Sequence, residues 1–193
     1  MKFFLTASII GSICFACFSV NAQSKFSFGP NAGVGHSWVS GYQNNQFKLA
    51  ANAGLSFVYS AAEHFGIGLD AKYSFEGVKT SGNSVDLDYF RFPLKAIYFF
   101  NNYGDKLRPK VYAGPSFGFL SSAKSADLDV KKAFNSTDIG LTAGAGLNYR
   151  LVNSTWFNAD INYVHGFTDV IKSAAVKGHN RSIGVNVGVN FGL

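Results

Sequence analysis

The sequence predicts an all-β protein, an eight-stranded antiparallel up-and-down transmembrane β-barrel preceded by a cleaved signal peptide. Three observations support this fold class. Eight segments alternate apolar residues with small or polar ones, and a period of two is the pattern of a β-strand. The polar faces are rich in glycine, which suits a crowded lumen. Aromatic residues gather at both ends of the apolar faces, as at the two interfaces of an outer-membrane barrel.

The N-terminus has the features of a signal peptide. Lys2 supplies a positive charge, residues 3–18 are apolar, and Val20-Asn21-Ala22 is a small-residue cleavage site. We therefore expect a signal peptide over residues 1–22 and a barrel domain over residues 23–193. This leader predicts export through the inner membrane.

The composition excludes several other classes. The net charge of +6 comes from scattered basic residues, so no nucleic-acid partner is predicted. No later apolar run approaches the roughly 20 residues that a membrane helix needs. Both cysteines, Cys14 and Cys17, lie in the leader, so the mature chain would contain no disulfide. A retained anchor and lipid attachment at Cys17 are the alternatives to simple cleavage.

The first four segments cover residues 26–38, 46–59, 64–75 and 85–100. The first three each keep a single phase. In the fourth, Val85, Leu87 and Tyr89 occupy odd positions, whereas the apolar residues from Phe90 onward occupy even ones. A β-bulge near Tyr89 would absorb this change of phase.

The other four segments cover residues 108–120, 138–151, 155–167 and 181–191. Residues 138–151 are the clearest, because apolar odd positions there oppose small or polar residues at even positions, three of which are glycine. Short and long connections then alternate along the chain, with one exception at residues 39–45. Short periplasmic turns and longer outer loops are typical of outer-membrane barrels, so both termini are expected in the periplasm.

Aromatic side chains at the predicted periplasmic strand ends would form a membrane-interface girdle. These are Phe26, Phe28, Tyr59, Phe65, Tyr98, Phe100, Tyr149, Phe157 and Phe191. A second girdle, from Trp38 to Phe167, lies toward the opposite ends. A soluble secreted barrel of the lipocalin type is the alternative, but it would not require two girdles.

Nine charged side chains fall on the predicted inner faces. They are Lys48, Asp70, Lys72, Arg91, Lys95, Lys110, Asp138, Arg150 and Asp160. An eight-stranded barrel is only just wide enough for its own side chains, so we expect ion pairs that fill the lumen. A selectivity lining is the alternative, and the surplus of cations would leave room for water or an anion.

Four stretches resemble the PorT-like family of outer-membrane β-barrel proteins of Gram-negative bacteria. They read F-G-P-N-A-G-V-G (28–35), R-F-P-L-K-A-I-Y-F-F (91–100), V-Y-A-G-P-S-F-G-F-L (111–120) and D-I-G-L-T-A-G-A-G-L-N-Y (138–149). The resemblance covers the mature chain and implies an eight-stranded barrel, with an accessory role in protein secretion for some members. Barrels often end on an aromatic that the assembly machinery reads, whereas here Gly192 and Leu193 follow Phe191.

We expect a protein of the cell outer membrane with a small filled lumen and a structural, secretion-accessory or surface-interaction role. The alternative is a narrow passive channel. A lipid-modifying enzyme comes third, on His165 near Asp160 together with a loop serine, but nothing in the sequence places a nucleophile and a base within mutual reach, and we expect no enzyme. The four histidines lack metal-ligand spacing, so neither metal nor cofactor is expected. We expect the barrel to contact outer-membrane lipid, the barrel-assembly machinery and, through its outer loops, an envelope protein. We also expect it to be a monomer.

Overall fold

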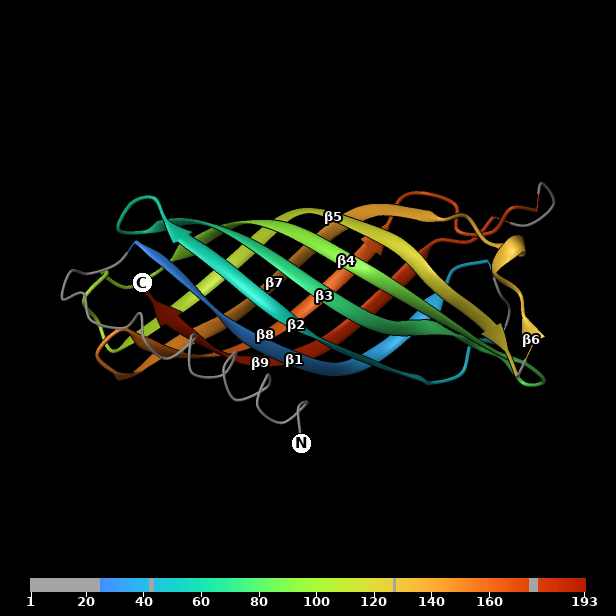
Figure 1. Ribbon diagram of the computed structural model, residues 1–193, viewed down its shortest axis with the longest axis horizontal. Coiled ribbons are helices and arrows are strands. Elements are labelled where there is room, and N and C mark those ends of the chain that lie inside the picture. Colours follow the sequence, from blue (N-terminus) through green and yellow to red (C-terminus); the bar gives the residue numbers. More distant parts are fainter. Residues whose placement is uncertain (1–24, 42–43, 127, 174–176) are drawn as a thin grey trace, which may run out of the picture.

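The protein forms a closed antiparallel β-barrel (Figure 1). The computed structural model describes residues 25–41, 44–126, 128–173 and 177–193. Eight long strands pair with their neighbours in chain order, and the last strand pairs with the first to close the barrel. The predicted fold class is confirmed. The predicted leader, residues 1–22, lies outside the described residues. Within the described part, no helix is long and apolar enough to cross a membrane.

The strand bounds agree closely with the alternating segments. The eight barrel strands are β1 (Phe26–Val39), β2 (Lys48–Ser60), β3 (Phe65–Lys79), β4 (Ser84–Phe99), β5 (Leu107–Ser125), β7 (Thr137–Val152), β8 (Thr155–Gly166) and β9 (Asn180–Gly192). A two-residue strand, β6 (Leu128–Asp129), pairs with the end of β5, and a short 3-10 helix, η1 (Lys131–Ala133), follows it.

The two ends of the barrel differ in their connections. β1 begins and β9 ends at the left end in Figure 1, where Phe28 pairs with Phe191. We call this the periplasmic end, because short turns join the strands there. The opposite, outer end carries β6, η1 and the long connection between β8 and β9. Both termini of the barrel therefore lie at one end, as an even number of strands requires.

Close strand packing accounts for the glycine-rich inner face. A Cβ atom on Gly54 would lie 2.0 Å from the carbonyl oxygen of Ala71, and one on Gly35 would lie 2.1 Å from that of Ile183. No side chain fits at such distances. The opposite face carries exposed apolar side chains such as Leu55, which suits contact with lipid.

The predicted change of phase in β4 is wrong. Leu87 and Tyr89 are fully buried and point inward, as do the odd residues that follow them. A register shift does occur between Asp88 and Tyr89, but the extra residue is Ser121 on the neighbouring strand β5. Leu87 and Tyr89 are apolar because they belong to a buried cluster inside the lumen. The sequence pattern predicted lipid-facing positions for them because apolar residues usually face lipid.

That buried cluster fills the lumen at the outer end, and we call it the outer plug. It consists of Val39, Val78, Leu87, Tyr89, Leu120, Ala123, Phe134 and Val170. Four barrel strands supply six of these residues, and the long outer connections supply Phe134 and Val170. The loops therefore fold into the mouth of the barrel and bury apolar surface there.

Backbone hydrogen bonds join the two long outer connections to each other. The N–H of Asn135 donates to the carbonyl of Val170 at 2.9 Å, and the N–H of Lys172 donates to that of Ala133 at 3.0 Å. These bonds hold Phe134 and Val170 in the outer plug. The described parts of these two connections are thus fixed to each other.

Candidate functional site

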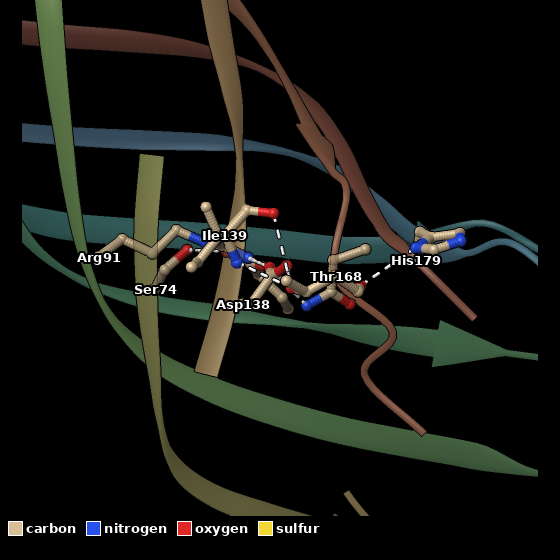
Figure 2. Close-up of polar contacts among 8 residues, drawn as sticks. Ser74, Arg91, Asp138, Ile139, Thr168 and His179 are labelled. Carbon is tan, nitrogen blue, oxygen red and sulfur yellow. Dashed lines mark hydrogen bonds and ion pairs between the residues drawn. The ribbon is translucent and has the colours of Figure 1, made fainter. Parts of the chain in front are cut away.

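A buried arginine links three strands just below the outer plug. Arg91 of β4 forms an ion pair with Glu76 of β3, and its Nη2 also lies 2.6 Å from Glu76 Oε2. The same Nη2 donates to Asp138 Oδ2 of β7 at 2.7 Å (Figure 2). All three side chains are buried. A charge taken out of water is costly unless it is paired and hydrogen-bonded, so these three residues depend on one another.

Asp138 also fastens the connection that follows β8. Its carboxylate accepts hydrogen bonds from Asn180 Nδ2 at 3.0 Å and from the Thr168 hydroxyl at 3.3 Å. The Thr168 hydroxyl in turn accepts the backbone N–H of Ile139 at 2.8 Å, and His179 Nδ1 lies 3.0 Å from the Thr168 carbonyl (Figure 2). We call the set Glu76, Arg91, Asp138, Thr168 and Asn180 the outer latch.

A second charged layer lies deeper in the lumen. Asp70 accepts Lys95 Nζ at 2.7 Å and the Ser56 hydroxyl at 2.8 Å, and Lys72 Nζ lies 3.1 Å from its other oxygen. Lys110 of β5 forms an ion pair with Asp160 of β8 at 2.9 Å. Every one of these charges therefore has a partner of opposite sign.

The charges of the latch and of the deeper layer balance. The four carboxylates are Asp70, Glu76, Asp138 and Asp160, and the four cations are Lys72, Arg91, Lys95 and Lys110. Glu76 completes this balance. The alternation in the sequence predicts a strand only as far as Phe75 and a loop at Glu76, whereas β3 continues to Lys79.

Two predicted lumen charges lie outside these layers. Lys48 pairs with Asp86, whose side chain is 55% exposed, at the outer rim. Arg150 lies at the periplasmic end, where its guanidinium carbon is 5.8 Å from the ring centre of Trp156. No carboxylate of the described residues forms an ion pair with Arg150. Arg108, a buried residue of β5 at the same end, is a further inward cation. The sequence did not predict its inward position, because Arg108 is the first residue of its alternating segment.

Little space remains between the lumen side chains. Cavities of about 40 Å³ and 30 Å³ lie beside the two charged layers. Each has room for a few water molecules, since one water needs about 10–15 Å³ of such volume. A third cavity of about 80 Å³ lies at the periplasmic end. The lumen thus holds small cavities between layers of packed side chains.

The predicted interface aromatics lie at the periplasmic end and none is buried. Phe28, Phe157 and Phe191 are half-buried, and the other six are exposed. Several rings contact one another: Phe65 packs edge-on against Tyr98, and Tyr98 packs edge-on against Phe100, both with ring centres 5.2 Å apart. This arrangement supplies an aromatic belt on the outer face of the barrel.

The residues considered for enzymatic chemistry do not come together. Asp160 points into the lumen toward Lys110, whereas His165 lies on the outward face of β8 and its Nδ1 is 3.1 Å from the Tyr163 hydroxyl. Among the described residues, no group of three or more His, Cys, Asp or Glu could hold a metal ion. The predicted pair of His165 and Asp160 is therefore divided between two faces of one strand.

The closed antiparallel barrel, its glycine-rich inner face and its aromatic belt are the features of an integral outer-membrane β-barrel. A family model described as outer membrane protein beta-barrel domain matches residues 21–172, and the chain belongs to that family. The predicted location in the outer membrane of a Gram-negative cell is thereby confirmed. No curated protein matches the chain.

Solved structures share this architecture. Neisserial surface protein A is 20% identical with a TM-score of 0.65, and the match covers 88% of this chain and 98% of that one. Outer membrane protein W of E. coli is 15% identical with a TM-score of 0.55, covering 90% and 100%. The outer membrane enzyme PagL is 17% identical with a TM-score of 0.52, covering 83% and 97%. At such identities the likeness concerns the fold.

Proposed function

We propose that this barrel does not conduct and acts through its outer surface, in a structural, secretion-accessory or surface-interaction role. The supporting observation is the outer plug, in which Val39, Leu87 and Val170 are fully buried. Water and ions avoid an apolar constriction, so a solute would have to displace these side chains first. The proposal includes membership of the PorT-like group, on the four stretches that resemble it.

The charged layers beneath the plug add a second obstacle. A solute that passed the plug would meet Arg91, which is held on both sides by carboxylates. Opening this layer would leave buried charges unpaired, which is costly. A narrow channel is therefore the less favoured function, although the charge-lined lumen is the feature that would serve it.

The outer surface offers a place for a partner to bind. An open hollow of about 560 Å³ lies between η1 and the connection after β8, and Lys131, Lys132 and Lys172 line it together with one carboxylate, Asp129. The backbone bonds between the two connections hold these lysines side by side. A positive surface of this kind suits an acidic partner.

We propose no enzymatic activity for this chain. The support is the separation of His165 from Asp160, because a carboxylate that orients a catalytic histidine must lie within hydrogen-bond reach of it. We further propose a monomeric barrel that contacts outer-membrane lipid and is inserted by the assembly machinery.

Single-channel recording tests the proposal directly. Residues 23–193 would be refolded, checked by a heat-shift gel, and incorporated into a planar bilayer. We expect no conductance steps from the folded protein. Stable steps whose size changes in Arg91→Gln would overturn the proposal in favour of a channel.

Loop trimming tests the part of the proposal that concerns the outer surface. Replacing residues 128–133 by a short Gly-Ser linker removes two of the three lysines, and replacing the turn at residues 80–83 of the same end serves as the matched control. We expect only the first replacement to produce the envelope phenotype of the deletion strain. A phenotype from both replacements, or from neither, would contradict the proposal.

A further inference from the structure

The periplasmic end contains two arginines that no ion pair balances. Arg108 and Arg150 belong to the paired strands β5 and β7, and both point into the lumen. Arg108 is only 3% exposed. Within the described ranges, neither guanidinium forms an ion pair with a carboxylate, in contrast to the four paired cations above them.

The surroundings hold Arg108 in place without neutralising it. Its guanidinium carbon lies 4.0 Å from the ring centre of Phe99 and 5.1 Å from that of Tyr103. Its Nη2 donates to the backbone carbonyl of Glu63 at 2.6 Å. Aromatic faces and carbonyl oxygens orient a cation but leave its full charge, and low local polarity strengthens its attraction for an anion.

These arginines line a partly open cavity of about 80 Å³. Trp156, Tyr103 and Asn148 form part of its wall. The volume accommodates several waters, and therefore one carboxylate or phosphate group. No acidic residue lines the cavity.

The acidic residues of this end lie elsewhere. Glu63 and Asp105 are exposed on the turns before β3 and β5. The Asp105 carboxylate accepts the backbone N–H of Asn102 at 2.9 Å. Neither side chain contributes to the wall of the cavity. Both carboxylates attract the Arg108 guanidinium through space, but neither forms an ion pair with it, so both arginines can still pair with a ligand that enters from the periplasm.

We propose that this cavity is a binding site for a small oxyanion, a carboxylate or phosphate group presented from the periplasm, with Arg108 and Arg150 as its ligands. Guanidinium groups bind both oxyanions through paired N–H donors. The chain end or acidic side chain of a periplasmic polypeptide and a phosphorylated headgroup would each supply such a group. The site lies at the end of the barrel opposite the proposed partner surface and does not depend on that proposal.

Trp156 provides a reporter inside the cavity. The chain contains two tryptophans, and Trp38 lies near the outer end. In the folded mature barrel carrying Trp38→Phe, only Trp156 fluoresces as tryptophan. We expect a saturable change in its fluorescence on titration with inorganic phosphate or acetate at constant ionic strength, with affinity of about millimolar order for so small a ligand.

Three variants decide whether the arginines form the site. Arg150→Gln should weaken binding by roughly tenfold or more, which corresponds to loss of one charge-assisted hydrogen bond. Arg150→Lys should restore part of it, since the charge returns without the planar fork. Lys106→Gln is the matched control, because Lys106 is exposed at the same end and lies 5.2 Å from the ring centre of Tyr149 outside the cavity. It should bind as the parent does.

Two results would overturn the site. One is the absence of any saturable change in protein that the heat-shift gel shows to be folded. The other is equal weakening by Lys106→Gln and Arg150→Gln, which would mean diffuse attraction to a positive end. A peptide with a free terminal carboxylate and glycerol 3-phosphate distinguish the two sources. Tighter binding of the peptide than of its amidated form supports the site and assigns it to polypeptide, whereas tighter binding of glycerol 3-phosphate supports the site and assigns it to a headgroup.

Discussion

The two ends of the barrel treat buried arginine in opposite ways. At the outer end, Arg91 is enclosed by Glu76 and Asp138 beneath an apolar plug. At the periplasmic end, Arg108 and Arg150 line a cavity and have no acidic partner among the described residues. The same side chain therefore serves cohesion at one end and remains available to a ligand at the other. A charged lumen residue cannot be assigned a role without its counter-charge.

Substituting the arginines at the two ends should have very different effects on stability. Arg91→Met leaves Glu76 and Asp138 buried without their cation, so we expect a loss of about 3–5 kcal/mol in the free energy of unfolding. Arg150→Met leaves no carboxylate unpaired and should cost less than about 1 kcal/mol. Urea unfolding of refolded barrels, followed by the heat-shift gel, measures both.

An equal loss of unfolding free energy in the two variants would contradict this expectation, because the ion pairs of Arg91 would then add no more stability than the unpaired Arg150. The double variant Arg91→Met with Glu76→Gln sharpens it further. Removing both members of a buried pair leaves fewer orphaned charges, so part of the loss should be recovered.

The outer plug should contribute stability that a lipid-facing residue of the same strand does not. Leu87→Ala removes a fully buried side chain and should cost about 2–5 kcal/mol. Leu94→Ala alters a residue of the same strand that is 41% exposed on the outward face, and it should cost clearly less. The same unfolding assay compares them. A larger loss from Leu94→Ala would show that the plug is loosely packed.

The connection after β8 should loosen in acid. Backbone N–H groups of Gly178 and Ile171 donate to the Asp169 carboxylate at 2.8 and 3.2 Å and lower the pKa of that carboxyl below its usual value of 3.8. Because the pKa is lower in the folded state, these hydrogen bonds stabilise the fold at pH values above the pKa of the unfolded state. That stabilisation is lost as the pH falls through the pKa of the folded state. The amide proton shift of Gly178 should therefore titrate below pH 3.8.

Asp169→Asn is the control for this titration. The amide retains an oxygen acceptor but cannot change charge, so the shift of Gly178 should no longer follow pH. Titration that persists in Asp169→Asn would place the acid sensitivity elsewhere in the connection. This effect should be the smallest of the three, because Asp169 is only half-buried and its neighbours remain in the plug.

The strands could be predicted from the sequence because lipid and lumen demand different residues on alternate positions. The same rule failed at Leu87 and Tyr89, where the lumen itself is apolar. It also stopped one residue before Glu76, and so it missed the carboxylate that balances Arg91. Alternation indicates which face of the strand a residue occupies. It does not indicate whether the surroundings of that face are apolar or charged at a given depth in the barrel.

The loop contacts lay beyond this kind of prediction. Phe134 and Val170 reach the plug only after the barrel has closed and the two connections have paired. Arg108 and Arg150 could be recognised as inward cations, but their lack of a partner depends on which turns carry Glu63 and Asp105. Such features depend on neighbours that are distant in the chain.

The outer plug has a consequence for the cell that carries this protein. Every open pore in an outer membrane weakens the barrier against toxic solutes, so the number of open pores must be limited. On the proposal that the outer plug closes the lumen, this barrel escapes that limit. The cell can therefore display it densely without becoming more permeable, and abundance becomes a variable that selection can adjust independently of uptake.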